Sequence, residues 1–274
     1  MTSQTEALNR AAGWLRKADG LLITAGAGMG VDSGLPDFRG TQGLWAAYPA
    51  LGHAKIPFES IANPKAFAQD PALAWGFYGH RLALYRTIEP HEGFTILKRW
   101  ADRMAKGSFV YTSNVDGQFQ KAGFSENSIV ECHGSIHYLQ CLQACSADIW
   151  SAAGFFLEVD EHACRLTNPF PRCSRCSALA RPNVLMFGDW AWLESRTERQ
   201  QARLKYWLGS IERLVVVEIG AGTGLSTVRR FSERHGPRVI RINAREPAID
   251  GPKGVGIQGR AVEVLSALNR LWDI

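Results

Sequence analysis

A short apolar run near the start of the chain ends abruptly in a glycine-rich segment. Residues 21–25 (Leu-Leu-Ile-Thr-Ala) have the length and apolar character of a strand that is buried on both faces. Gly26, Gly28 and Gly30 follow this run directly. Glycine allows a tight turn and lets bare backbone N–H groups approach a phosphate closely. A buried strand followed by such a turn favours a parallel sheet that binds a pyrophosphate at its carboxyl edge.

The same apolar pattern returns along the chain and alternates with segments of helical character. Amphipathic or helical stretches cover residues 7–15, 72–86 and 261–271. Buried strands that alternate with helices predict an α/β fold with a Rossmann-like, doubly wound parallel sheet. The further segments that read as strands are 108–112, 128–131, 183–187, 213–219 and 238–243.

The composition is that of an ordinary globular protein. Of 274 residues, 46% are hydrophobic and 21% are charged, which excludes a disordered or fibrous chain. The 31 Lys and Arg against 26 Asp and Glu leave a formal charge of only +5, which does not call for nucleic acid as a specific partner. Residues 1–20 lack the apolar core of a signal peptide, and no apolar run is long enough to cross a bilayer. We therefore expect a cytoplasmic protein without a membrane partner, whose six cysteines are thiols or metal ligands.

The glycine segment continues into a longer motif that is more specific than the turn itself. An ordinary dinucleotide fingerprint would have an Asp or Glu about 20 residues further on, at the end of a second strand, and none is present there. Instead, residues 26–40 resemble the signature of the sirtuin (Sir2) family, of the bacterial type. That resemblance implies NAD as the cofactor. The residues that it implies in NAD binding here are Gly26, Ala27, Gly28, Asp37, Phe38 and Arg39.

Polar residues follow the predicted strand 108–112, where ligands bind in open α/β sheets. Residues 112–116 (Thr-Ser-Asn-Val-Asp) are similar to the sirtuin motif Thr-Gln-Asn-(Ile/Val)-Asp. The similarity implies that Asn114 lies near the ribose of NAD and that Asp116 contacts the nicotinamide carboxamide, both in catalytic roles. Ser113 stands where the family has a Gln that orients the ribose hydroxyls. This substitution leaves open whether the ribose reacts with an acyl group, with another nucleophile or with water.

A Cys-His-Gly-Ser segment at residues 132–135 follows the next short strand. A lone histidine beside a glycine is often structural, but in sirtuins the His-Gly pair at this place supplies the general base. The resemblance therefore assigns this role to His133, since a base with a pKa near neutrality suits proton removal from a ribose hydroxyl.

The cysteines form two chelating pairs separated by a long loop. Cys141 and Cys145 are four residues apart, and Cys173 and Cys176 are three apart, a common zinc spacing. Sirtuins carry a structural zinc held by four cysteines at this point, directly after the His-Gly strand. We expect Zn²⁺ on these two pairs, with Cys164 as a spare that could replace Cys145.

The resemblance also implies a substrate site. Tyr78 and Arg81 are three apart on a predicted helix and therefore face the same way. Sirtuins that remove succinyl and malonyl groups hold the acyl carboxylate with a Tyr-x-x-Arg in this helix, although a core tyrosine beside a solvated arginine would give the same spacing. Residues 181–189 resemble the segment on which an acyl-lysine peptide adds as a strand. The residues that this implies in peptide binding are Val184, Phe187 and Gly188.

Residues in the C-terminal part of the chain complete the expected NAD site. Gly220 and Thr223 take the place of the family's Gly-Thr-Ser turn, and Asn243 ends a later strand on the adenosine side. We expect a discontinuous Rossmann-like NAD-binding domain and a small domain made of a helical module and a zinc-binding module. Their expected bounds are 1–45, 92–137 and 180–274 for the large domain, and 46–91 and 138–179 for the two modules.

The resemblance implies an enzyme: a monomeric NAD-dependent protein lysine deacylase, acting on acetyl or succinyl groups, that transfers the acyl group to ADP-ribose and releases nicotinamide. A sirtuin-like protein ADP-ribosyltransferase or NAD hydrolase is the alternative that Ser113 leaves open. A non-enzymatic zinc module that binds nucleic acid is an alternative of another class, and it leaves the polar motifs at the sheet edge unexplained.

Overall fold

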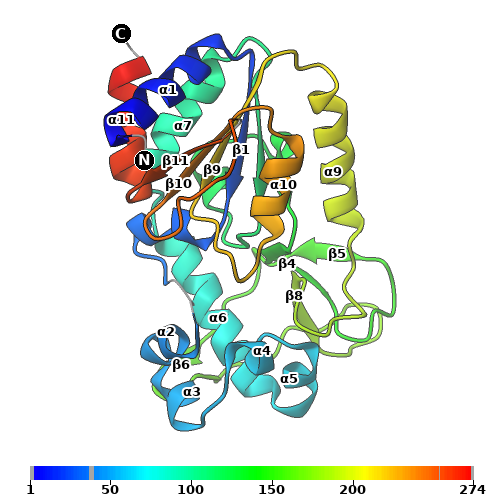
Figure 1. Ribbon diagram of the computed structural model, residues 1–274. Coiled ribbons are helices and arrows are strands. Elements are labelled where there is room, and N and C mark those ends of the chain that lie inside the picture. The colour runs from blue at the N-terminus through cyan, green and yellow to red at the C-terminus, as the bar shows by residue number, and fades with distance from the viewer. Residues whose placement is uncertain (1–2, 37–39, 253, 273–274) are drawn as a thin grey trace.

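A six-stranded, fully parallel sheet forms the centre of the larger part of the molecule (Figure 1). The structure is a computed structural model that describes residues 3–36, 40–252 and 254–272. The strand order is β11-β10-β9-β1-β2-β3, so the chain reverses its direction of winding beside β1, as in a doubly wound fold. The predicted fold class is therefore confirmed. The strands are β1 (Gly20–Ala25), β2 (Ser108–Thr112), β3 (Ile129–Glu131), β9 (Leu214–Ile219), β10 (Val239–Asn243) and β11 (Gly254–Gln258).

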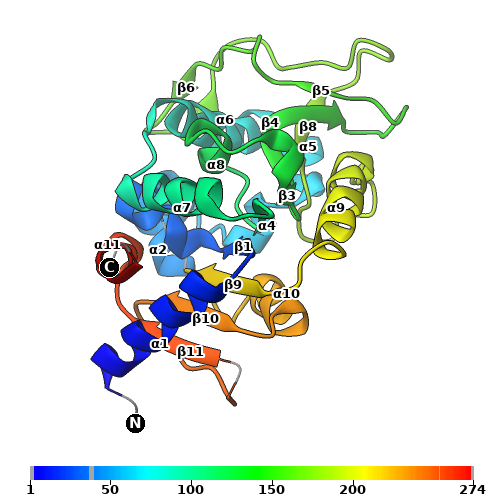
Figure 2. The same ribbon diagram turned by 90° about the horizontal axis from the view of Figure 1, so that it is seen from above.

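Helices cover both faces of this sheet, which explains why its central strands β1 and β9 are largely apolar, with Thr24 and Glu218 as buried exceptions. Leu21 and Ile23 of β1 pack into one core, whereas Leu22, between them, packs into the core on the opposite face. Figures 1 and 2 show α1, α7 and α11 grouped on one side, and α10 on the other with α9 next to β3. These helices are α1 (Gln4–Lys17), α7 (Glu92–Arg103), α9 (Ser195–Leu208), α10 (Thr227–His235) and α11 (Ala261–Trp272).

The rest of the chain builds a smaller unit with its own apolar core. Its longest helix, α6, begins after Asp70, whose carboxylate accepts a hydrogen bond from the Leu73 N–H and caps the first turn. Tyr78 and Trp75 of α6 are fully buried in this core. The helices are α2 (Gly40–Ala47), α3 (Pro49–His53), α4 (Phe58–Ile61), α5 (Pro64–Gln69) and α6 (Pro71–Thr87).

Two small antiparallel sheets complete this unit. The first has the order β5-β4-β8 and the second is the hairpin β6-β7. The strand expected at 183–187 lies earlier, at β8, and pairs antiparallel with β4 instead of joining the parallel sheet. The division of the chain into a large and a small domain stays a prediction. The strands are β4 (Gly134–Cys141), β5 (Ile149–Ser151), β6 (Val159–Asp160), β7 (Arg165–Leu166) and β8 (Ala180–Val184).

Short helical turns connect these elements: η1 (Ala27–Met29), η2 (Val31–Ser33), α8 (Gln118–Lys121) and η3 (Glu126–Ser128). Within the ranges that the structure describes, we find no helix with both the length and the apolar character that a membrane span requires.

Candidate functional site

Two glycine turns meet at the carboxyl ends of β1 and β9. The Gly28 N–H donates to the Gly220 carbonyl over 3.0 Å, and the Gly26 N–H donates to the Ile219 carbonyl over the same distance. Gly220 has a φ of +62°, and a Cβ on it would lie only 2.4 Å from the carbonyl carbon of Gly28. Both turns therefore require glycine, because their backbones touch.

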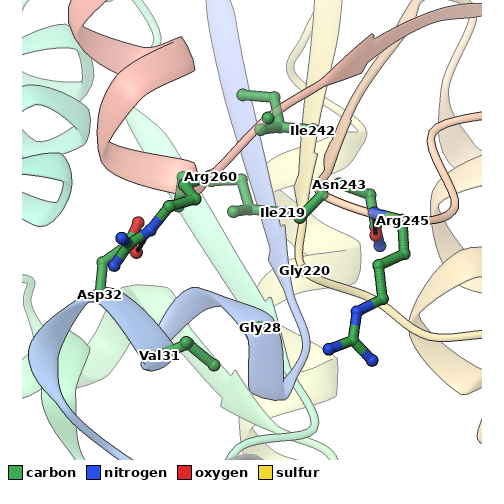
Figure 3. A pocket seen from close by; sticks show the side chains of 12 residues that line it. Gly28, Val31, Asp32, Ile219, Gly220, Ile242, Asn243, Arg245 and Arg260 are labelled. Carbon is green, nitrogen blue, oxygen red and sulfur yellow. Dashed lines mark hydrogen bonds and ion pairs between the residues drawn. The ribbon is translucent and has the colours of Figure 1, made fainter.

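A pocket opens beside these turns, at the carboxyl edge of the parallel sheet (Figure 3). Gly28, Gly220 and Asn243 line it, so three residues that the sequence implied in cofactor binding come together here. Arg245, Arg260 and Asp32 also line the pocket, and because Asp32 pairs with Arg260, the charge of Arg245 leaves the pocket cationic. A cationic pocket beside two glycine turns suits a pyrophosphate-containing cofactor, which is what the sequence predicted.

Hydrogen bonds around the buried Asn243 side chain fix the part of the site formed by β10 and the second glycine turn. Asn243 donates to the Ala221 carbonyl over 2.9 Å and accepts from the N–H groups of Arg245 and Glu246 over 3.0 Å each. The Thr223 hydroxyl donates to the Glu246 carboxylate over 2.7 Å. These bonds hold the second glycine turn against the loop that follows β10.

The predicted polar cluster is attached to the first glycine turn. The Asn114 side-chain amide donates to the Gly26 carbonyl over 3.0 Å, and the Ser113 N–H donates to the Ala25 carbonyl over 3.1 Å. Asn114 is oriented in turn by the Thr112 hydroxyl, which accepts from its backbone N–H. The end of β2 is thus tied to the end of β1 at the place where the cofactor pocket begins.

His133 lies between the two sheets, on the two-residue link that joins β3 to β4. The backbone of Ser113 lies close enough to its imidazole to influence its pKa. Burial lowers the pKa of His133 below its usual value, and the Ser113 backbone opposes this shift only in part. The side chain is therefore neutral at pH 7 and able to accept a proton.

Asp116 is almost fully buried and has an unusual acidity. Burial, helped by the charge of Glu131, raises its pKa to about 6 against the opposing effects of the Gln118 N–H and the Arg81 charge. Its carboxylate accepts from the Gln118 N–H over 2.9 Å, and its backbone carbonyl is bonded to the His137 ring. A strongly perturbed carboxyl group next to a polar cluster is typical of a functional site.

The four predicted zinc ligands converge. The sulfurs of Cys141, Cys145, Cys173 and Cys176 all lie within 4.8 Å of one another. The Cys141–Cys176 and Cys145–Cys173 sulfur pairs are each 3.6 Å apart. A tetrahedral zinc with Zn–S bonds of about 2.3 Å separates its sulfurs by about 3.8 Å, so the cluster fits Zn²⁺.

The local backbone favours a thiolate at Cys173, whereas the neighbouring sulfurs raise the pKa of Cys145 to about 12. Backbone N–H groups of Cys176 and Arg175 point at the Cys173 sulfur and lower its pKa to about 7. Cys164 lies instead in the core of the smaller unit, where its carbonyl packs against Gly76 of α6. It does not take the place of Cys145 in the sulfur cluster.

Tyr78 and Arg81 are both buried on α6, in the aromatic core of the smaller unit. Arg81 lies among the rings of Phe77, Tyr78 and Tyr85, with its Cζ at 5.2, 5.7 and 5.4 Å from their centroids. The spacing alone would also fit a core tyrosine beside a solvated arginine. The structure excludes that interpretation, because the Arg81 guanidinium is buried.

The segment expected to bind peptide follows β8. Val184 is buried, Phe187 is half-buried with its N–H bonded to the Ala62 carbonyl, and Gly188 is exposed with a φ of +63°. A fully buried ion pair between Arg181 and Asp189, 2.8 Å long, closes this segment into a loop.

Three predicted cofactor residues, Asp37, Phe38 and Arg39, lie outside the described residues. The structure also reveals site residues that sequence reasoning missed. Asp32 lines the pocket, pairs with Arg260 over 2.6 Å and accepts from the Val262 N–H at the start of α11. These residues are more than 200 positions apart, so no local pattern links them.

Comparison with known protein families identifies related sequences. A model of the Sir2 family matches residues 26–216. A protein of Pyrobaculum aerophilum named NAD-dependent protein deacylase 2 is 34% identical over 248 residues, which cover 90% of this chain and 88% of that protein. The NAD-dependent protein deacylase of Thermococcus kodakarensis is 30% identical and covers 97% of this chain and 96% of its own length.

Solved structures are similar in fold. A Sir2 homologue in complex with NAD superposes with a TM-score of 0.70 at 23% identity, covering 96% of this chain and 93% of that one. A Sir2 homologue mutant in complex with ADP-ribose also gives 0.70, at 24% identity and 96% coverage of both chains. At this identity the likeness concerns the fold alone.

Proposed function

The chain belongs to the Sir2 family, and on this premise we propose that it is an NAD-dependent protein lysine deacylase. Its curated relatives carry the name NAD-dependent protein deacylase. The observation that carries the proposal is the position of His133, whose imidazole lies beside the Ser113 backbone at the sheet edge where Asn114 reaches the first glycine turn. With one water molecule consumed, the acyl group of an acyl-lysine protein passes to ADP-ribose, and the free lysine amine and nicotinamide are released.

The two glycine turns and the end of β10 hold NAD. Gly26, Ala27, Gly28 and Gly220 offer backbone to the pyrophosphate, and Thr223 and Asn243 shape the adenosine side. Bound NAD supplies an electrophilic ribose carbon that loses nicotinamide, and a ribose hydroxyl that carries the acyl group away. We assign Asp37, Phe38 and Arg39 to the nicotinamide side on the resemblance alone.

The catalytic work of the protein falls on three side chains. His133 takes the proton from a ribose hydroxyl, because its lowered pKa keeps it unprotonated at pH 7. Asn114, held by the Gly26 carbonyl, orients the ribose. Asp116 accepts a hydrogen bond from the nicotinamide carboxamide, and its pKa of about 6 keeps it mostly ionised at neutral pH.

Zinc stabilises the smaller unit without entering the reaction. Four cysteine ligands close the coordination sphere and leave no position for a water or a substrate. The sulfur cluster lies at the end of β4, the strand that begins directly after His133. The metal therefore anchors the strand that follows the base.

The acyl-lysine substrate lies along the segment after β8. Val184, Phe187 and Gly188 contact its backbone, and Tyr78 and Arg81 receive an acyl chain that ends in a carboxylate, such as succinyl or malonyl. The burial of Arg81 among aromatic rings supports this preference, because a desolvated guanidinium attracts a carboxylate far more strongly than a solvated one. We further propose that the enzyme acts as a monomer in the cytoplasm.

The test is a product analysis with NAD and matched acetyl- and succinyl-lysine peptides. Wild-type protein should give O-acyl-ADP-ribose and nicotinamide, whereas His133→Ala should give neither while still binding NAD. His162, an exposed histidine of the smaller unit, provides the control, and His162→Ala should match wild type. Undiminished turnover in His133→Ala would overturn the assignment of the base.

Ser113 favours a second candidate, NAD hydrolysis or ADP-ribosyl transfer. Its short side chain cannot reach as far as the Gln that the family carries, so a ribose hydroxyl is held less firmly. Free ADP-ribose formed without peptide would support hydrolysis, and ADP-ribosylated protein would support transfer.

A further inference from the structure

One turn beyond Arg81, α6 carries a second tyrosine that binds the guanidinium directly. The Tyr85 hydroxyl accepts from Nε of Arg81 over 3.0 Å and from Nη2 over 2.8 Å. Both side chains are buried, with 8% of Arg81 and 6% of Tyr85 exposed. The spacing of four residues places the two side chains on the same face of the helix.

This contact fixes which edge of the guanidinium can bind an anion. A guanidinium is planar and binds a carboxylate through two parallel N–H donors, either from the Nε–Nη2 edge or from the terminal Nη1–Nη2 edge. In this protein the Tyr85 oxygen occupies the Nε–Nη2 edge. A carboxylate that binds Arg81 in two places must therefore approach the terminal edge.

The partner on the occupied edge carries no charge. Burial raises the pKa of Tyr85 above its usual value, so the hydroxyl stays protonated at every pH at which the protein works. A phenol orients the guanidinium and leaves its positive charge in place. A carboxylate at the same position would cancel that charge. The contact with Tyr85 therefore leaves the positive charge of Arg81 in place.

We propose that Tyr85 is a positioning residue that aims the terminal edge of Arg81 at the carboxylate of a dicarboxylic acyl chain on the substrate lysine. The inference rests on the proposed function, in which Arg81 receives that chain. A guanidinium that is ordered before binding loses less conformational freedom when the ligand arrives. Tyr85 therefore contributes to selectivity between acidic and neutral acyl groups, and it does not take part in the chemistry.

The experiment compares Tyr85→Phe, which keeps the ring and removes only the hydroxyl, with wild type. KM and kcat are measured at saturating NAD for two peptides that differ only in a succinyl or an acetyl group on the lysine. We expect KM for the succinyl peptide to rise about tenfold, because the guanidinium is no longer ordered before the peptide binds, with kcat nearly unchanged. The acetyl peptide should change by less than about twofold. Tyr206→Phe, at a tyrosine that is 87% exposed, is the matched control.

The same substitution made in an Arg81→Met variant separates a positioning role of Tyr85 from a general effect on the fold. In Arg81→Met the hydroxyl has no guanidinium to orient, so adding Tyr85→Phe should have no further effect on the succinyl peptide. An equal loss on both peptides, or a further loss in the Arg81→Met background, would overturn the inference. So would a wild-type enzyme that does not prefer the succinyl peptide.

Peptide binding measured by fluorescence anisotropy keeps the inference separate from the proposed function. If wild type binds the succinyl peptide more tightly than Tyr85→Phe does, but no peptide is turned over with NAD, the proposed function fails and the inference stands. If wild type turns over acyl peptides and both proteins bind the succinyl peptide equally, the inference fails and the proposed function stands.

Discussion

Gly28 and Gly220 lie in backbone contact, with the N–H of Gly28 bonded to the carbonyl of Gly220 over 3.0 Å. The contact joins the turn after β1 to the turn after β9, and both turns line the same pocket. The shape of the cofactor site therefore depends on a second turn that lies nearly 200 residues away in the sequence.

Gly220→Ala should disrupt this contact. A Cβ there would lie 2.4–2.5 Å from three backbone atoms of Gly28 and Met29, at a φ of +62° that disfavours alanine. We expect a loss of about 1–3 kcal/mol in the free energy of unfolding and markedly weaker NAD binding. Denaturant unfolding and calorimetric titration with NAD measure the two effects. Gly224→Ala, in the same turn but with nothing within 4 Å of its Cβ, should leave both unchanged.

Cys145→Ala should release the metal. Cys145 is exposed, so its replacement removes no buried packing and tests its role as a ligand alone. We expect the zinc content, measured by mass spectrometry, to fall well below one ion per chain and the melting temperature to drop. Cys164→Ala should keep the full zinc content although it alters a buried side chain. Equal zinc in Cys145→Ala and wild type would contradict the four-cysteine site.

The activity should depend on two protonations on the acid side. His133 must be neutral and Asp116 ionised, and both groups gain a proton as the pH falls through their pKa values, which lie below the usual histidine value and near 6. The logarithm of kcat/KM should therefore fall steeply between pH 7 and pH 5. Asp116→Asn removes one of these protonations and should give a lower but less steep profile. Parallel profiles in the two proteins would exclude Asp116 from the reaction.

Asp189→Ala should be strongly destabilising. Asp189 and Arg181 form an ion pair with neither side chain exposed, and Asp189 also accepts from the Ala191 N–H. Removing one partner of a buried pair leaves an uncompensated charge, at a cost of about 3–5 kcal/mol. Denaturant unfolding should show this loss. Asp102→Ala breaks the exposed pair with Lys98 and should cost less than about 1 kcal/mol.

The sequence was most informative where a strand is buried on both faces. β1 and β9 lie at the centre of the sheet, so their apolar runs were recognisable without any structure. β11 was missed because Gly254 and Gly256 interrupt its apolar character, and Gly256 is needed where a Cβ would lie 2.1 Å from the Pro247 carbonyl oxygen. Such a requirement depends on a neighbouring loop and leaves no periodic signal.

The strand predicted at 183–187 was misplaced relative to β8 for a related reason. The strand contains Arg181 and Asn183, which are polar and yet buried, because distant partners satisfy them: Asp189 for the arginine and Gln140 for the asparagine. The sequence reading therefore began the strand at the apolar residues that follow. The candidate site shows the same limit of sequence reasoning. Motifs whose residues lie close together in the sequence were predicted, whereas the pair of Asp32 and Arg260, 228 positions apart, was not.

His133 lies on the two-residue link between β3 of the parallel sheet and β4 of the antiparallel sheet, whereas Tyr78, Arg81 and Tyr85 lie on α6. The proposed base and the residues that we propose to select the acyl group are thus carried by separate stretches of chain. Changes in the sequence of α6 alone would alter the acyl groups that such an enzyme accepts. The residues that act on NAD would stay unchanged. For the protein engineer, grafting α6 between relatives is the corresponding experiment.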